Sequence, residues 1–318
     1  MTSQSPSTAV DAVRFDAVEK RFGTTTALAG SSFAIARGEM FGLIGPDGAG
    51  KTTAIRLLCG LLRPDAGTVT VLGVDPAGQH RAITERVGYL SQRFTLYGDL
   101  TIDENIEFFA EIRGVRNFRP RREQLLEMTR LTPFRRRLAD RLSGGMKQKL
   151  ALACTLVHEP ELVVLDEPTT GVDPVSRREF WKLLSAFLAR GVTIVMSTPY
   201  LDEAERCTRV VLMHEGRVLA ADEPSRLRAR LPGGLLEVVA PGVAAAVDAV
   251  RRVPGVVDAH AFGDRLHVRL ASADAVAVDA FTGHLRRGLA PEASVRAVEA
   301  SLEDVFIATL EQQEHAHA

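Results

Sequence analysis

Hydrophobic and polar positions follow two different patterns along this 318-residue chain, and the change comes near residues 231–234. Before that point, short apolar runs predict strands separated by stretches with helical spacing. The predicted strands are residues 13–17, 32–36, 40–44, 162–165, 192–196 and 209–213. Residues 53–62 carry apolar positions at helical spacing, and residues 101–141 read as an arginine-rich helical stretch. We therefore expect an α/β sheet with a helical insertion at about residues 93–160.

The remainder of the chain has a different order of elements. It reads strand, helix, strand, strand, helix, strand, at residues 235–240, 243–252, 256–260, 265–270, 274–289 and 294–299. This βαββαβ order is typical of the ferredoxin-like arrangement, a small α+β fold. A last helix is expected to begin at Ser301. The predicted organisation is therefore a disordered tail (1–10), an α/β domain (11–230), a ferredoxin-like accessory or regulatory domain (233–311) and a tail (312–318).

Composition narrows the class of protein. The chain is 46% hydrophobic and 25% charged, as soluble globular domains are. A net charge of −1 gives no general attraction to nucleic acid or to anionic lipid. The first ten residues lack the basic and apolar regions of a signal peptide, and no uncharged apolar run approaches the ~18 residues that span a bilayer. We expect no nucleic-acid partner and no membrane span, so any work at a membrane requires a partner.

Cysteine and histidine suggest no chemistry of their own. The three cysteines, Cys59, Cys154 and Cys207, show no paired spacing and are expected to be small apolar fillers in a reducing compartment. The eight histidines show no metal-ligand spacing. Candidate chemistry must therefore come from other residue types.

The stretch GPDGAGKTT, between a predicted strand and a predicted helix, fits the phosphate-binding pattern G-x-x-x-x-G-K-[ST]. Gly48 and Gly50 allow the backbone to approach phosphates closely, and the N–H groups at the helix start point at the anion. Lys51 is expected to neutralise the outer phosphates, and Thr52 to ligate Mg²⁺. The predicted nucleotide-binding residues are Gly45, Pro46, Asp47, Gly48, Ala49, Gly50, Lys51, Thr52 and Thr53.

The stretch LVVLDEP, residues 162–168, supplies two carboxylates at the end of a buried strand. Asp166 is placed to hold Mg²⁺, directly or through water, and Glu167 to orient and deprotonate an attacking water. The alternative is an acidic loop after a core strand. The phosphate-binding loop in the same chain favours the reading with ATP and Mg²⁺ as cofactors.

The stretch RLSGGMKQKLALA, residues 141–153, contains a second helix start built for a ligand, with Ser143 as N-cap. LSGG after a phosphate-binding loop and before LDEP resembles the ATP-binding cassette (ABC) ATPases, over about residues 10–230. The resemblance implies a P-loop NTPase fold and a head-to-tail pair of ATPase domains, as a homodimer or a heterodimer. Ser143, Gly144 and Gly145 would then act in trans on the nucleotide of the second domain, with Asp173 at the same interface.

The resemblance also assigns single residues. Gln92, in YLSQ, matches the glutamine that senses Mg²⁺ and faces the transmembrane partner; its alternative is an exposed polar loop residue. Phe22 matches the aromatic that stacks on adenine; its alternative is a core aromatic. Asp47 stands where asparagine is common, and a carboxylate close to phosphates would be repelled unless it turns toward solvent or meets a cation. Glu167, Lys51 and Gln92 are the predicted catalytic residues.

One position departs from the family pattern. Where these ATPases end a strand with a histidine that contacts the γ-phosphate, this chain has Pro199, which offers no side-chain hydrogen bond and no backbone donor. Two interpretations follow. In the first, Glu167 and Mg²⁺ suffice for hydrolysis, and a neighbouring residue or water replaces the lost contact; the retained glutamate favours this one. In the second, the site binds ATP but hydrolyses it slowly and works beside a competent partner.

The single ATPase domain, the βαββαβ unit and SLEDVF at residues 301–306 resemble the ATPase subunits of ABC-2-type exporters. The resemblance implies an ATP-hydrolysing subunit, peripheral at the cytoplasmic face of the cell membrane, that drives a separate transmembrane permease. The arginine-rich insert is the expected docking site, and its alternative is a solvated basic face. Two other functions stay open: a regulatory subunit with weak hydrolysis, and a soluble ABC ATPase outside transport. The second domain reads as a dimer contact, a regulatory module or a passive appendage.

Overall fold

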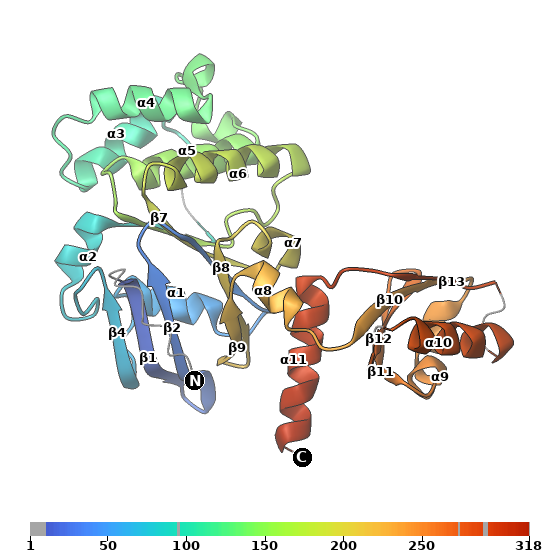
Figure 1. Cartoon of the computed structure of the whole chain (residues 1–318). Helices are drawn as coiled ribbons and strands as arrows, with labels where there is room; N and C mark the ends of the chain where they lie inside the picture. The colour runs from blue at the N-terminus through green and yellow to red at the C-terminus, as the bar shows by residue number, and fades with distance from the viewer. Residues whose placement is uncertain (1–10, 94–95, 273, 289–291, 318) are drawn as a thin grey trace. The chain divides into compact units, whose positions relative to one another are not determined.

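The computed structural model describes residues 11–93, 96–272, 274–288 and 292–317 (Figure 1). The predicted tail at residues 1–10 lies outside the described residues. The chain divides into two compact units, with the division between residues 224 and 225. Each unit is described by itself below.

The first unit contains a six-stranded sheet in the order β5-β6-β7-β3-β8-β9. Its strands are parallel except for β9, which runs antiparallel to β8. Every residue of β3, β6 and β7 is buried, as continuous apolar runs in a sheet covered on both faces should be. The strands are β3 (Met40–Ile44), β5 (Val87–Leu90), β6 (Leu162–Asp166), β7 (Thr193–Thr198), β8 (Arg209–His214) and β9 (Arg217–Asp222).

A second, antiparallel sheet in the order β2-β1-β4 belongs to the same unit. Its strands are β1 (Asp11–Phe22), β2 (Thr25–Ala36) and β4 (Ala66–Val71). Phe15 of β1 stacks on Phe33 of β2, with ring centroids 4.5 Å apart, and Phe33 in turn stacks on Phe41 of β3. These rings belong to one hydrophobic core, which joins the two sheets and places α1 between them.

Helices α3, α4, α5 and α6 of the first unit lie together on one side of its strands (Figure 1). The predicted helical stretch 101–141 is broken into two α-helices and two 3₁₀ turns, because Gly114 (φ 70°) and Arg130 (φ 57°) take left-handed conformations that end helices. The helices are α1 (Lys51–Leu58), α2 (His80–Arg86), α3 (Ile102–Ile112), α4 (Arg119–Thr129), η1 (Thr132–Phe134), η2 (Ala139–Arg141), α5 (Gly144–Leu156), α6 (Pro174–Leu188), α7 (Leu201–Ala204) and α8 (Pro224–Ala229), the last crossing the division between the units.

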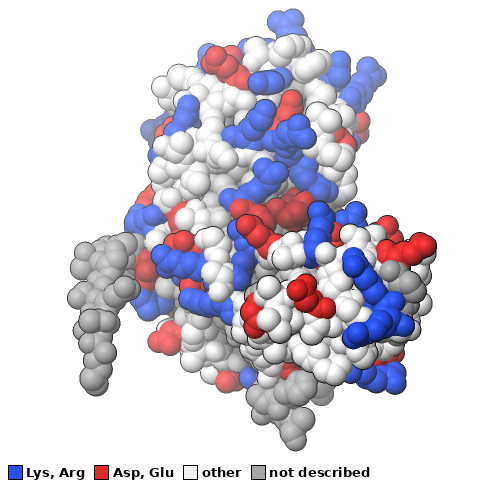
Figure 2. Space-filling view, turned by 45° about the vertical axis from the view of Figure 1, so that its right-hand side comes forward, with Lys and Arg blue, Asp and Glu red and all other residues white. Residues whose placement is uncertain are grey.

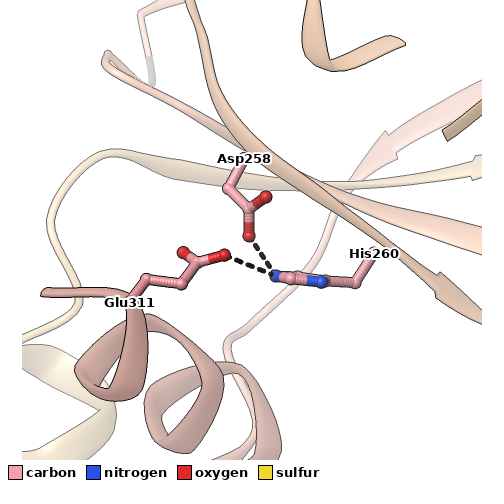
Figure 3. Close-up of side chains that lie close together, drawn as sticks. All are labelled: Asp258, His260 and Glu311. Carbon is pink, nitrogen blue, oxygen red and sulfur yellow. Dashed lines mark ion pairs between the residues drawn. The ribbon is translucent and has the colours of Figure 1, made fainter. Parts of the chain in front are cut away.

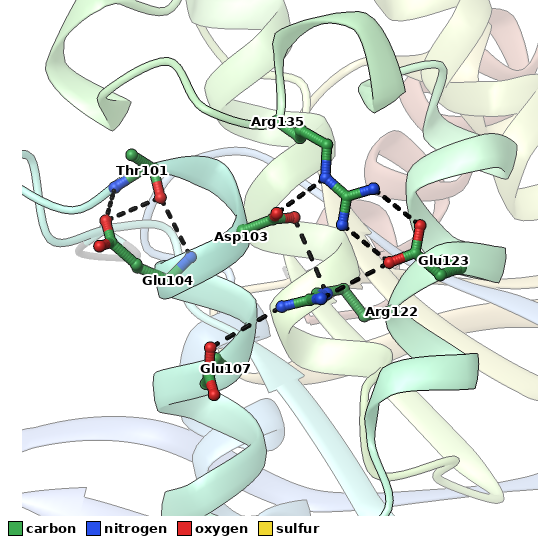
Figure 4. A network of polar contacts seen from close by, with 7 residues as sticks. All are labelled: Thr101, Asp103, Glu104, Glu107, Arg122, Glu123 and Arg135. Carbon is green, nitrogen blue, oxygen red and sulfur yellow. Dashed lines mark hydrogen bonds and ion pairs between the residues drawn. The ribbon is translucent and has the colours of Figure 1, made fainter.

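Ion pairs connect α3 and α4 (Figure 4). The Arg135 guanidinium donates to Asp103 at 2.7 Å and to both carboxylate oxygens of Glu123, at 2.9 and 2.7 Å. Arg122 lies within 4 Å of Asp103, Glu107 and Glu123. These two arginines therefore hold the insert together. Figure 2 shows further Lys and Arg side chains, interrupted by acidic ones, over the region of α3 to α6.

The second unit is a four-stranded sheet in the order β11-β12-β10-β13, with every neighbouring pair antiparallel. This is the order that a ferredoxin-like βαββαβ chain requires. Phe281 and Leu285 of α10 belong to the apolar core on one face of this sheet. The elements are β10 (Gly234–Val239), η3 (Val243–Ala246), α9 (Val247–Arg251), β11 (Val256–Phe262), β12 (Arg265–Leu270), α10 (Ala275–Gly288), β13 (Ser294–Ala297) and α11 (Leu302–His317). Helix α11 continues past residue 311, where the sequence suggested that a tail begins.

The three cysteines are buried and unpaired, which confirms that they are small fillers of the core. Burial raises the pKa of all three thiols, that of Cys207 to about 12. Within the residues that the structure describes, no helix combines the length and the apolar character needed to cross a membrane.

Candidate nucleotide-binding site

The carboxyl ends of four adjacent parallel strands, β5, β6, β7 and β3, form one edge of the main sheet. The segments that follow these strands carry Gln92 after β5, Asp166 and Glu167 at the end of β6, Pro199 after β7, and residues 45–53 after β3. Open α/β sheets bind ligands at this edge. Motifs that are far apart in the sequence thus come together by the order of the strands.

Glycines shape the loop between β3 and α1. Gly48 and Gly50 have φ values of 82° and 100°, in the region that side chains disfavour. A Cβ atom on Gly50 would lie 2.5 Å from the carbonyl oxygen of Ala27, and one on Gly45 would lie 2.2 Å from that of Met213. No side chain caps α1, so the N–H groups of its first turn remain free to bind an anion. Asp47 is exposed, which agrees with the alternative in which its carboxylate turns toward solvent.

Lys51 is buried under this loop, with 4% of its surface exposed. Its Nζ donates hydrogen bonds to the carbonyl oxygens of Gly45 at 2.7 Å and Pro46 at 3.0 Å, and it lies 3.6 Å from Glu167 Oε1. The ammonium group therefore stands between the glycine-rich loop and a carboxylate. From this position its charge is available to the outer phosphates of a nucleotide held by the loop.

Asp166 is the buried carboxylate of the site, with 2% of its surface exposed. The hydroxyls of Thr52 and Ser197 donate to its Oδ1, at 3.2 and 2.6 Å. Carboxylate and hydroxyl oxygens are ligands that suit a hard divalent cation. The pair Thr52 and Asp166 could hold such an ion, with Ser197 keeping the carboxylate in place.

Glu167 has a left-handed backbone, with φ 48°. Its N–H donates to two oxygens of Ser197, the hydroxyl at 3.0 Å and the carbonyl at 3.2 Å. Its Oε2 accepts hydrogen bonds from Gln92 Nε2 at 3.0 Å and from the Thr170 hydroxyl at 3.4 Å. Gln92 is exposed, yet its amide is bonded to the carboxylate that the sequence singled out as the base.

The residues predicted to act in trans form a separate group at the starts of α5 and α6. Ser143 caps α5 by accepting from the Met146 N–H at 3.3 Å. Asp173 caps α6, and the Ser176 N–H is the main cause of its lowered pKa. A Cβ atom on Gly145 would lie 2.1 Å from Ser176 Oγ, so the two helix starts are in close contact. Gly144 has open space in front of it.

Phe22 ends β1, and 47% of its surface is exposed. The interpretation of Phe22 as a core aromatic is therefore wrong. The ammonium of Lys20 lies 5.8 Å from its ring centroid. A ring that is open to solvent on the surface of the unit is free to stack on a flat ligand.

The end of β7 carries a polar network that the sequence did not reveal. Glu203, with 1% of its surface exposed, accepts hydrogen bonds from the Thr169 hydroxyl at 2.6 Å and the Thr198 hydroxyl at 2.8 Å. Arg177 lies 3.5 Å from the same carboxylate. The network connects the residue before Pro199 to the segment after Glu167. Thr169, Thr198 and Glu203 form no motif in the sequence and meet only through the fold.

Comparisons with known proteins agree with this geometry. Residues 28–170 match the family model described as ABC transporter. The chain is 48% identical over 225 residues to the probable multidrug ABC transporter ATP-binding protein YbhF of Escherichia coli (strain K12), which covers 70% of this chain and 39% of that protein. It is 38% identical over 304 residues to the daunorubicin resistance ATP-binding protein DrrA2 of Streptomyces coeruleorubidus, over 93% of this chain and 94% of the relative. The chain thus spans about two fifths of YbhF and nearly all of DrrA2.

A solved structure shows the same fold. The structure of an ATP-binding subunit of an ABC transporter matches with a TM-score of 0.63 and 30% sequence identity. The match covers 69% of this chain and 92% of that subunit.

Proposed function

This chain belongs to the ATP-binding proteins of ABC transporters, and we propose that it is the ATP-hydrolysing subunit of an exporter whose membrane-spanning part is a separate permease. The names of its relatives support export: one is named a probable multidrug ABC transporter ATP-binding protein and another a daunorubicin resistance ATP-binding protein. Localisation would then be peripheral, at the cytoplasmic face of the membrane, through the permease.

One observation carries the proposal: Lys51, Thr52, Asp166, Glu167 and Gln92 meet at one edge of the sheet through direct contacts. The loop and Lys51 would bind the phosphates of ATP. Thr52 and Asp166 would hold Mg²⁺, which neutralises charge on the phosphates during transfer, and Gln92 would contact the same ion. Glu167 would orient and deprotonate the attacking water, with the Gln92 amide fixing its carboxylate.

The second part of the proposal concerns pairing. Ser143, Gly144 and Gly145 are expected to cover the γ-phosphate held by a second ATPase domain, with Asp173 at the same interface. The open space in front of Gly144 supports such a contact, while the close packing of Gly145 on Ser176 holds the starts of α5 and α6 together. ATP binding would close the pair, and hydrolysis would reopen it. Phe22 would stack on the adenine.

The permease is expected to contact the helical insert beside Gln92. Of the arginines there, Arg122 and Arg135 are engaged in ion pairs within the insert, so docking would rely on its other exposed groups. This refines the expectation that the arginine-rich insert as a whole is the docking surface.

A second candidate function is a regulatory subunit that binds ATP and hydrolyses it slowly. Pro199 favours it, because a proline at the end of β7 contributes no side-chain hydrogen bond to the site. In that case an active partner would supply most of the turnover.

The test is Mg-ATP turnover by the purified chain beside its Glu167→Gln variant. We expect the wild type to release phosphate, and the variant to bind ATP and accumulate as a nucleotide-dependent dimer. Wild-type turnover as slow as that of the variant would favour the regulatory function. Absence of any ATP-dependent dimer in Glu167→Gln would contradict the pairing mechanism, and co-purification with RNA instead of a membrane protein would contradict export.

A further inference from the structure

Three side chains with metal-binding groups converge in the second unit (Figure 3). Asp258 and His260 lie two residues apart on β11, so they point to the same face of the sheet. Helix α11 brings Glu311 to this pair. One ligand atom of each residue can be chosen so that all three lie within 4.8 Å of one another.

The imidazole nitrogen at the centre of this cluster makes no hydrogen bond. His260 Nε2 is a buried atom without a hydrogen-bonding partner. Its neighbours are instead two carboxylate oxygens, Asp258 Oδ2 in close contact and Glu311 Oε1 at 3.5 Å, with which it forms ion pairs that lack hydrogen-bond geometry. Buried polar atoms are rarely left without a partner, and each exception calls for an explanation such as an ion.

Two arginines hold the outer oxygens of the carboxylates. Arg251 Nε donates to Asp258 Oδ1 at 3.2 Å, and Arg269 Nη2 donates to Glu311 Oε2 at 3.4 Å. The other oxygen of each carboxylate is thereby directed at His260. Groups that bind the outer atoms of metal ligands orient the ligands in this way.

We propose that Asp258, His260 and Glu311 bind one divalent transition-metal ion of the Zn²⁺ class. Imidazole nitrogen and carboxylate oxygen are both ligands of Zn²⁺, at about 2.0–2.2 Å. The 3.5 Å between His260 Nε2 and Glu311 Oε1 suits two ligands of one tetrahedral ion, whereas His260 Nε2 and Asp258 Oδ2 are in closer contact and would move apart to admit the ion. The two carboxylates supply two negative charges for a dication. The ion joins strand β11 to helix α11 and fastens the last helix of the chain to the sheet.

A second contact holds the start of the same helix, so loss of the metal does not release α11 completely. His267 Nδ1 lies 2.8 Å from Asp304 Oδ1, and the Asp304 carboxylate also accepts hydrogen bonds from the N–H and hydroxyl of Ser301. Variants of the metal ligands should therefore fold. The effect of the ion should be confined to the C-terminal part of α11.

The experiment uses the full chain, treated with a chelator, dialysed and titrated with Zn²⁺ without nucleotide. We expect one Zn²⁺ bound per chain. Loss of a group that only orients a metal ligand can lower metal affinity by up to ~100-fold. Loss of a ligand itself, in His260→Ala or in Glu311→Gln, should lower the affinity for Zn²⁺ by at least that factor. Hydrogen exchange of residues 305–311 should slow with Zn²⁺ in the wild type and stay unchanged in His260→Ala.

Two control variants test the location. His284→Gln removes an exposed histidine of α10 in the same unit, and His315→Ala with His317→Ala removes the histidines near the chain end. Both should bind Zn²⁺ as the wild type does. The proposal is overturned if the wild type takes up no more Zn²⁺ than His260→Ala. It is also overturned if the chain-end substitutions abolish uptake, or if Zn²⁺ leaves the exchange of α11 unchanged.

Discussion

Strands β6 and β7 lie side by side in the main sheet, but their carboxyl ends do different work. The end of β6 supplies the charged groups Asp166 and Glu167. The end of β7 supplies Ser197, which binds the Asp166 carboxylate and the backbone of Glu167, and Thr198, which binds the buried Glu203. One strand provides the charges, and its neighbour fixes their positions.

This division changes the meaning of Pro199. Pro199 follows β7 at the position where ABC ATPases carry a histidine that contacts the γ-phosphate. Judged by that histidine alone, β7 has lost its contribution to the site. Here the two residues before the proline already make the buried polar contacts, and Gln92 already binds the Glu167 carboxylate. We therefore expect the rate of hydrolysis to depend on the carboxylates at the end of β6 and on the β7 residues that position them. It should depend little on the side chain at position 199.

The largest expected effect is at the end of β6. Glu167→Gln removes the base while keeping the shape of the side chain, and we expect turnover to fall by about 10²–10⁴-fold with ATP binding retained. Phosphate release and nucleotide binding measure the two quantities. Glu85→Gln, an exposed acidic residue of α2, is the control and should hydrolyse ATP as the wild type does. Near-normal turnover in Glu167→Gln would place the base elsewhere.

The next effect tests the supporting strand. Ser197→Ala leaves the Asp166 carboxylate and the Glu167 N–H without their hydroxyl partner, at a cost of about 1–3 kcal/mol in unfolding free energy. Since the displaced groups are the ones that act, we expect roughly tenfold slower turnover as well.

The matched control lies at the other end of the same strand. Thr193 accepts a hydrogen bond from the Gly38 N–H at 3.0 Å and is also buried. Thr193→Ala should lower the unfolding free energy to a similar extent and leave the turnover of the folded protein unchanged. Equal losses of turnover in both variants would show that β7 matters only for stability.

A smaller effect is expected at the amino end of β6. Hydrogen bonds from Arg86, and then Arg37, lower the pKa of Glu161 from 4.5 to about 2. The ionised carboxylate therefore stabilises the fold above pH 4.5, and this contribution is lost as the pH falls toward about 2. Because the side chain is 43% exposed, we expect less than about 1 kcal/mol.

Urea unfolding of the wild type and Glu161→Gln measures this contribution. The difference between their unfolding free energies should be largest near neutral pH and shrink below pH 4.5. A difference that stays constant with pH would show that the ion pairs contribute nothing.

The smallest effect is expected at Pro199. Pro199→His should change turnover by no more than about twofold, less than 0.5 kcal/mol, because Glu167 is already held by Gln92 and Ser197. Pro199→Ala separates loss of the proline ring from gain of an imidazole. A tenfold gain specific to Pro199→His would reverse this view and identify a site that binds ATP more than it hydrolyses it.

The sequence predicted those parts of the fold that depend on local patterns. Strand β3 has the predicted bounds, and the core strands β6 and β8 were recognised because continuous apolar runs mark buried strands. Strands β4, β5 and β9 were missed, and β4 begins within a stretch, residues 63–67, that reads as a turn. The reasons are clearer for β5 and β9. The first has four residues, and the second is a half-buried edge strand without clear alternation. Neither offers a pattern that stands out from a loop.

The sequence predicted the charged residues of the site but not the residues that hold them in place. Lys51, Asp166 and Glu167 lie in motifs whose spacing indicates their chemistry. The roles of Ser197 and Glu203 depend on tertiary structure, since Asp166 faces Ser197 only through the register of β6 and β7. The histidines showed no ligand spacing because His260 meets Glu311 through folding of the second unit. Contacts between distant segments leave no periodic trace in a sequence.

The burial of the cysteines has a practical consequence. Cys59, Cys154 and Cys207 are enclosed by the core and have raised pKa values, so thiol reagents should not label the folded chain. A cysteine introduced at an exposed position would therefore be the single reactive thiol on the surface. Ser143→Cys on one copy of the chain and Asp47→Cys on another could be cross-linked when the start of α5 in the first copy approaches the glycine-rich loop of the second. The native cysteines therefore need not be removed before such cross-linking experiments.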